Sequence, residues 1–160
     1  MIRPAGLRSG ANIGVISPSY WIADDVLKNT AEIFTSRNFH LTYGESIKLK
    51  EGPFAGPPEL RADDLNNMFA DPNIDAIFCA RGGYGANRVL PLLNYDLIKE
   101  NPKIFIGNSD ITAYLTSITQ KTEIITFHGP MLVSYKHGFI EYNFDQMMKV
   151  LTRNENTVIN

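Results

Sequence analysis

The chain has 160 residues, of which 44% are hydrophobic and 20% are charged, and these proportions are typical of a soluble globular domain with a core of its own. Its net charge of −2 provides no positive surface field, so we expect no nucleic-acid partner. Because the sequence has neither an apolar run approaching about 18 residues nor the apolar segment of a signal peptide, it predicts a cytoplasmic protein with no membrane partner.

Short apolar runs alternate with amphipathic segments along the chain. In order, we expect strands at 13–17, 39–43, 74–80, 104–107 and 124–128, and helices at 23–36, 58–70, 87–93, 110–120 and 143–152. Such alternation predicts an α/β fold in which helices cover both faces of a parallel sheet. The single cysteine, Cys79, lies in an apolar run, where we expect it to be a small buried hydrophobe.

Three loops should meet at one edge of this sheet, because ligands bind where the carboxyl ends of parallel strands gather. These are Ser17–Trp21 (SPSYW), Arg81–Gly85 (RGGYG) and Gly107–Asp110 (GNSD), which follow the first, third and fourth expected strands. The Gly- and Pro-rich segment 47–58 is long enough to form either a mobile flap or a loop that covers the site.

The RGGYG loop has two interpretations. Its adjacent glycines allow backbone N–H groups to face a ligand closely, which favours a cradle for an anion or oxyanion, but they also suit a tight strand-to-helix turn. The loop lacks the third glycine of a dinucleotide fingerprint, and the chain has no phosphate-binding Lys-Ser/Thr motif. We therefore expect no nucleotide cofactor.

The GNSD segment is equally open to two interpretations. Ser109 or Asp110 could simply cap the following helix. Alternatively, Ser109 lies on a nucleophile elbow, a sharp turn that exposes its hydroxyl above the sheet edge, and Asn108 suits such a turn because Asn tolerates left-handed backbone. Ile111 occupies the position where an α/β-hydrolase elbow has glycine, which argues against that superfamily.

His128 ends the last expected strand, where its ring either reaches the pocket edge or is hydrogen-bonded within a turn. The other histidines, His40 and His137, have no ligand-like spacing to it, so we expect no metal site.

Taken together, the segments ISPSY, LRADDLNNMFADPNIDAIFCARGGYGANRVLPLLNYDLI, NPKIFIGNSDIT and TFHGPM resemble the LD-carboxypeptidase family of serine peptidases, which includes muramoyltetrapeptide carboxypeptidases and microcin C7 self-immunity proteins. The resemblance implies a flavodoxin-like domain and a Ser-Glu-His triad with Ser109 as nucleophile. It also implies an oxyanion hole formed by the backbone N–H groups of Gly83 and Asp110. We further expect substrate contacts from Arg81, Gly82, Tyr84, Asn108 and His128. Asn108 departs from the family, which more often has an aromatic residue there.

In that family, the Glu and His of the triad lie in a second, C-terminal domain, and this sequence stops about where the connection to that domain would begin. The resemblance therefore implies that residues 1–160 are the nucleophile-bearing N-terminal domain, that the C-terminal domain is its partner, and that the fragment alone is inactive. The implied reaction removes the terminal D-alanine from murein tetrapeptides without a metal or cofactor, and we expect a homodimer. Two alternatives remain: a microcin-immunity hydrolase that acts on peptidyl or aminoacyl nucleotides, and a non-catalytic anion-binding domain.

Overall fold

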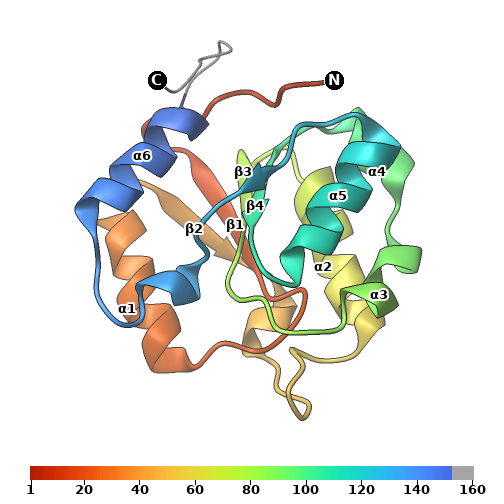
Figure 1. Ribbon diagram of the computed structural model, residues 1–160, viewed down its shortest axis with the longest axis horizontal. Coiled ribbons are helices and arrows are strands. Elements are labelled where there is room, and N and C mark those ends of the chain that lie inside the picture. The colour runs from red at the N-terminus through yellow and green to blue at the C-terminus, as the bar shows by residue number, and fades with distance from the viewer. Residues whose placement is uncertain (153–160) are drawn as a thin grey trace.

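A parallel sheet of five strands forms the centre of the computed structural model, which describes residues 1–152 (Figure 1). The strands are β1 (Asn12–Ile16), β2 (His40–Tyr43), β3 (Ala76–Cys79), β4 (Ile104–Gly107) and β5 (Phe127–His128). Their spatial order, β2-β1-β3-β4-β5, is that of doubly wound flavodoxin-like folds, and all neighbours are parallel. The predicted fold class is therefore confirmed.

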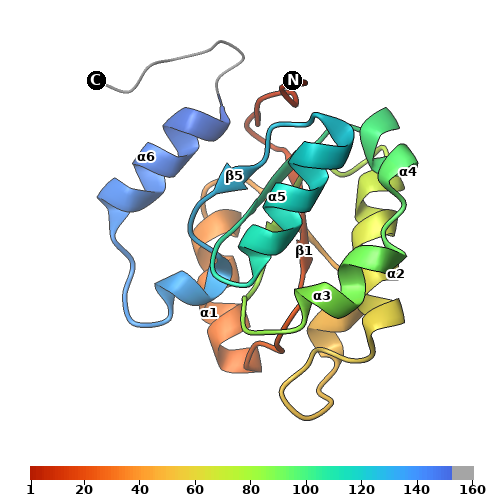
Figure 2. The same cartoon turned by 45° about the vertical axis from the view of Figure 1, so that its right-hand side comes forward.

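Helices cover both faces of the sheet (Figures 1 and 2). One face carries α1 (Asp24–Thr35) and α6 (Glu141–Leu151), and the other carries α2 (Pro58–Ala70), α3 (Ala86–Val89), α4 (Tyr95–Glu100) and α5 (Ile111–Thr122). Short 3₁₀ helices complete the structure: η1 (Glu45–Lys48), η2 (Leu90–Leu92) and η3 (Leu132–Tyr135).

Two apolar cores follow from the alternation of side chains along the strands. In β3, Phe78 contributes to the core under α1 and α6, whereas its neighbour Ile77 contributes to the core under α2 and α5. Phe34 of α1 packs edge-to-face on Phe78 at 5.5 Å between ring centroids, and Phe105 of β4 packs on Phe69 of α2 at 6.1 Å. The central strands β3 (AIFC) and β4 (IFIG) are fully buried, which explains their continuously apolar sequences.

The structure differs from the sequence prediction at three elements. The single helix predicted at 87–93 is instead the short helix α3 followed by the 3₁₀ helix η2. Helix α4 was not predicted, because six residues are too few to show helical periodicity; the Asn94 side chain caps it by accepting a hydrogen bond from the Leu97 N–H. The last strand was predicted over 124–128, but β5 has only the residues Phe127 and His128. Ile124 instead forms an isolated parallel bridge with Ile2.

The Gly- and Pro-rich segment covers the loop that follows β1. Ala55 is fully buried and its N–H donates to the Ser19 carbonyl, while Phe54 packs edge-to-face on Tyr20. The buried Arg61 guanidinium donates to the carbonyls of Gly56, in this segment, and of Pro18, in the loop after β1. Burial lowers the pKa of Arg61. Of the two predicted roles, the segment has that of a covering loop.

Candidate active site

The three loops predicted to share one edge of the sheet do meet there. The Tyr20 N–H, after β1, donates to the Gly82 carbonyl, after β3, at 3.2 Å. A side-chain carbon added to Gly82 would lie 3.1 Å from the Ser109 Cβ and 3.4 Å from its Oγ, so the glycine loop lies directly against the turn that carries Ser109. Residues far apart in the sequence therefore form one site.

Ser109 has a left-handed backbone conformation, with φ of 58°, and is exposed. A non-glycine residue in this region costs about 1–3 kcal/mol, and such strain is characteristic of functional sites. Our expectation that Asn108 would adopt this conformation is wrong, because Asn108 is not among the residues with positive φ. The Asn108 side chain instead donates to the Gly129 carbonyl at 2.9 Å, which connects the turn to the end of β5.

Neither Ser109 nor Asp110 caps α5 with its side chain. Asp110 occupies the cap position, but the first N–H groups of α5 donate to the backbone carbonyls of Asn108 and Ser109. Asp110 Oδ2 points away from its own helix and accepts hydrogen bonds from the Ser19 hydroxyl and the Ala86 N–H. The simple capping interpretation is therefore wrong, whereas the elbow interpretation agrees with the geometry.

The glycine loop contains a donor at Gly83, the residue after Gly82, that is unpaired within the described part of the chain. Gly83 has φ of 133°, and a side-chain carbon there would lie 2.3 Å from the Tyr20 ring, so only glycine fits. Among residues 1–152, neither the Gly83 N–H nor the Asp110 N–H has a hydrogen-bond acceptor. Asp110 follows Ser109 in the chain, and Gly83 follows Gly82, the glycine that lies against Ser109.

The other residues predicted to contact the substrate differ in their exposure and in their own contacts. The Arg81 guanidinium donates to the Trp21 carbonyl and lies over the Tyr20 ring, 5.6 Å from its centroid. Tyr84 is 56% exposed, and Gly82 is buried against Ser109. His128 is exposed at the end of β5, paired in register with Gly107.

No base is hydrogen-bonded to Ser109 within the part of the chain that the structure describes. The Ser109 hydroxyl has no hydrogen-bond partner among residues 1–152. His40 begins β2 and so lies at the opposite, amino-terminal edge of the sheet, while His137 is exposed in the loop before α6. Only His128 shares the edge that carries Ser109.

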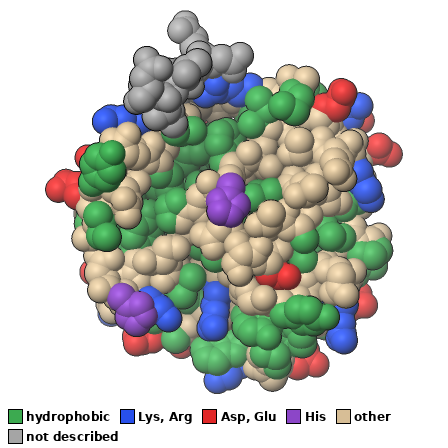
Figure 3. Space-filling model, viewed as in Figure 1, with side chains coloured by type: hydrophobic (Ala, Val, Ile, Leu, Met, Phe, Trp, Pro, Cys, Tyr) green, Lys and Arg blue, Asp and Glu red, His purple; other side chains and the backbone are tan. Residues whose placement is uncertain are grey.

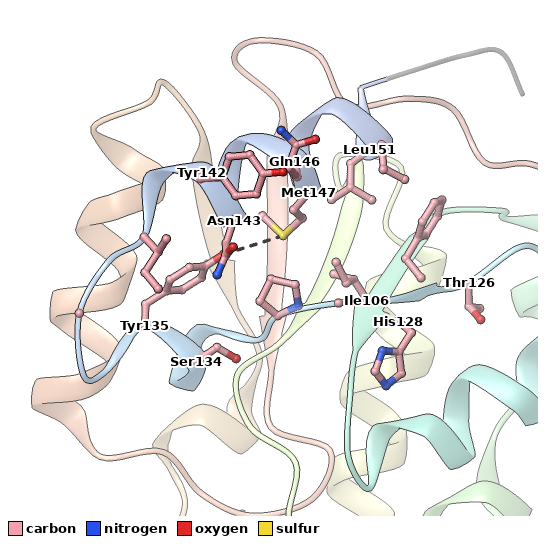
Figure 4. A pocket seen from close by; sticks show the side chains of 16 residues that line it. Ile106, Thr126, His128, Ser134, Tyr135, Tyr142, Asn143, Gln146, Met147 and Leu151 are labelled. Carbon is pink, nitrogen blue, oxygen red and sulfur yellow. Dashed lines mark hydrogen bonds between the residues drawn. The ribbon is translucent and has the colours of Figure 1, made fainter. Parts of the chain in front are cut away.

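A groove of about 560 Å³ runs between α6 and the end of the sheet at β4 and β5. Hydrophobic side chains gather on this face between α6 and the middle of the molecule (Figure 3). His128 lies at one end of the groove, and Tyr135 and Met147, whose Oη and Sδ are 4.0 Å apart, lie at the other (Figure 4). Neither Ser109 nor the glycine loop is among the lining residues, so the candidate nucleophile lies beside this groove and outside it.

Residues 1–152 show neither a metal-binding cluster nor a membrane-spanning helix. They contain no group of three or more His, Cys, Asp or Glu side chains placed to hold a metal ion. No helix in this part of the chain has the length and apolar character needed to cross a membrane.

A doubly wound α/β domain with a left-handed serine between a strand and a helix belongs to the class of domains that can carry a catalytic nucleophile. A family model described as the LD-carboxypeptidase N-terminal domain (peptidase S66) matches residues 13–129. The chain therefore belongs to the LD-carboxypeptidase family.

Individual relatives agree with this assignment. The chain is 39% identical to a probable murein peptide carboxypeptidase of Bacillus subtilis over 81% of its own length and 41% of the relative's. It is 33% identical to the microcin C7 self-immunity protein MccF of Escherichia coli, over 96% and 46%. The solved structure of an MccF-like protein from Bacillus anthracis superimposes with a TM-score of 0.89 at 35% identity, over 95% and 47%. The chain thus spans less than half the length of these relatives.

Proposed function

We propose that the chain is the nucleophile-bearing N-terminal domain of a serine LD-carboxypeptidase. The observation that carries this proposal is the left-handed turn at Ser109, which lies against Gly82. The Ser109 Oγ attacks the scissile carbonyl, and the N–H groups of Gly83 and Asp110 donate to the oxyanion that forms. Loss of one such donor typically costs about 3 kcal/mol of transition-state stabilisation.

The remaining triad members, Glu and His, lie in a C-terminal domain that follows this one. Two observations support the division: the chain spans less than half of its relatives, and the Ser109 hydroxyl has no partner among residues 1–152. The His accepts the proton of Ser109 and later donates it to the leaving amine, while the Glu orients the His.

The substrate is a murein tetrapeptide, cleaved between the L-centre of its diamino acid and the terminal D-alanine. The support is the similarity to the murein peptide carboxypeptidase of Bacillus subtilis. In this proposal Arg81, Gly82, Tyr84, Asn108 and His128 line the substrate, and no metal or nucleotide cofactor takes part. The enzyme acts in the cytoplasm as a homodimer.

Replacement of Ser109 by alanine in the two-domain enzyme tests the proposal. Ser109→Ala should fold normally and lose tetrapeptide cleavage by several orders of magnitude, since an activated nucleophile typically accounts for about a millionfold in rate. Release of D-alanine is the measurement, and circular dichroism controls for folding. Retention of more than about a tenth of the activity would contradict the assignment.

A second candidate is a microcin-immunity hydrolase. It is favoured by the 33% identity to MccF of Escherichia coli over 96% of this chain. Assaying the same enzyme in parallel on a murein tetrapeptide and on an aminoacyl nucleotide analogue distinguishes the two, because kcat/KM should be much higher for the true substrate. If neither is cleaved and Ser109 is unreactive, the domain is a non-catalytic binding module.

A further inference from the structure

The Asp110 carboxylate joins three loops at the candidate site. Its Oδ2 accepts a hydrogen bond of 2.6 Å from the Ser19 hydroxyl and one of 3.1 Å from the Ala86 N–H. Ser19 follows β1, Ala86 follows the glycine loop after β3, and Asp110 follows β4. Since β1, β3 and β4 are consecutive in the sheet, one oxygen atom connects the loops of its three central strands.

The hydrogen bond between the Ser19 hydroxyl and the Asp110 carboxylate is well suited to hold the two loops in place. Ser19 is fully buried, and a short bond from a hydroxyl to a carboxylate is stronger than a neutral hydrogen bond. The neighbouring residue, Tyr20, donates its N–H to the Gly82 carbonyl, and its ring fills the space next to Gly83. A continuous series of contacts therefore runs from the Asp110 carboxylate through Ser19 and Tyr20 to Gly83.

Both ends of this series carry the unpaired N–H groups described above. Asp110 supplies one donor from its own backbone, and Gly83 supplies the other. A pair of donors stabilises an oxyanion only if their spacing is fixed before the reaction, and a displacement of about 1 Å can cost on the order of a hundredfold in rate. The position of the Asp110 side chain is thus coupled to the spacing of the pair.

We propose that Asp110 is a positioning residue whose side chain sets the distance between the Gly83 and Asp110 N–H groups. This inference rests on the proposed function for its catalytic consequence. Because both hydrogen bonds converge on Oδ2, the role requires one correctly placed acceptor oxygen and no negative charge. An asparagine with its carbonyl oxygen at that position keeps both bonds, whereas alanine loses both.

The kinetic test compares variants of the two-domain enzyme on the murein tetrapeptide. Asp110→Ala should lower kcat by about 100-fold with KM changed by less than about threefold, because the donors act mainly in the transition state. Asp110→Asn should stay within about fivefold of the unsubstituted kcat. Ser19→Ala removes only one bond and should lower kcat by about 5- to 10-fold, which keeps the test decisive if Asp110→Ala fails to fold.

Asp64 provides a matched control, because its buried carboxylate also accepts two hydrogen bonds, from the N–H groups of Glu45 and Ser46 in η1. Asp64→Ala should destabilise the fold and leave kcat unchanged. Equal kcat losses for Asp110→Ala and Asp110→Asn would overturn the inference, as would a kcat for Asp110→Ala within about threefold of the unsubstituted enzyme.

Hydrogen exchange in the 160-residue chain separates this inference from the proposed function. The Ala86 amide should exchange at least about tenfold faster in Asp110→Ala, and at an unchanged rate in Asp110→Asn. Unchanged exchange in Asp110→Ala overturns the inference whatever the activity. The proposed function is overturned if the unsubstituted enzyme releases no D-alanine, or if the Ser109→Ala variant still releases it. In either case, the exchange result still decides whether Asp110 holds the loops together.

Discussion

Gly83 lies so close to the Tyr20 ring that no residue with a side chain fits in its place. A side-chain carbon at this position would lie 2.3 Å from the Tyr20 ring, and φ is 133°. Gly83→Val should therefore move the loop, misplace the Gly83 N–H and lower kcat by about 100-fold or more. The strained backbone should also cost about 1–3 kcal/mol of folding stability. Steady-state kinetics and urea unfolding of the two-domain enzyme measure the two effects.

Gly138 is the matched control for this substitution. Its φ of 138° is nearly the same, yet, apart from Gly138 and its two chain neighbours, no atom of residues 1–152 lies within 4 Å of the position that its side-chain carbon would take. Gly138→Val should show a similar backbone cost and unchanged kcat. If both variants lose activity equally, backbone strain in general explains the loss, and the oxyanion role of Gly83 is wrong.

At the scale of single residues, the sequence predicted which side chains meet but not how each is used. Ser109 and the glycine loop follow separate strands, and strand-to-helix alternation alone places them at one edge of the sheet. Ser19 and Tyr20 were recognised only as part of a loop, because their roles depend on the packing of Tyr20 against Gly83 and on the direction of the Asp110 side chain. Such directions are set by tertiary contacts between distant segments.

At the scale of elements, long periodic segments were predictable and short ones were not. The predicted helix at 58–70 coincides with α2, because it has proline at its first helical position and apolar residues at helical spacing. Strand β5 is shorter than its apolar sequence suggests, since Glu123 and Ile125, on either side of Ile124, hydrogen-bond instead to Ile2 near the N-terminus. The partner of an edge segment is not encoded in its own periodicity.

The packing of η3 against α1 and α6 predicts a dependence of stability on alkaline pH. Tyr135 is 7% exposed, among the rings of Phe34, Phe139 and Phe144. Burial raises the pKa of its phenol from 10.0 to about 12, and the Arg37 cation opposes this only in part. Because the folded-state pKa lies above the unfolded one, this contribution is complete below pH 10 and is lost as the pH rises towards 12.

Tyr135→Phe tests this linkage, since phenylalanine keeps the ring and removes the titrating group. Between pH 8 and pH 12, the free energy of unfolding of the unsubstituted chain should fall relative to Tyr135→Phe by on the order of 2 kcal/mol. Urea unfolding at several pH values provides the comparison. Parallel profiles for the two proteins would show that the phenol titrates alike in the folded and unfolded chains.

At the scale of the whole molecule, the proposed site has a nucleophile and two oxyanion donors, but no base within residues 1–152 is hydrogen-bonded to the serine. Ser109 has no hydrogen-bond partner among residues 1–152, and His128, the histidine on the same edge of the sheet, does not bond to it. A serine hydroxyl without an adjacent base is a weak nucleophile near neutral pH. The 160-residue chain alone should therefore be essentially inactive on a murein tetrapeptide, although it carries Ser109.

The expected loss of activity in the isolated chain is large enough to measure against the enzyme with an intact triad. An oxyanion hole without its base typically leaves about a thousandfold to ten-thousandfold acceleration over water, whereas an intact triad adds about a millionfold more. The purified chain should release no detectable D-alanine, and activity should appear when a separately produced C-terminal half is added. His128→Ala serves as the control, because among residues 1–152 His128 is the one histidine on the sheet edge that carries Ser109, and its removal should not alter the background rate. Robust cleavage by the chain alone, abolished by His128→Ala, would show that His128 serves Ser109 and that the triad is not divided between two domains.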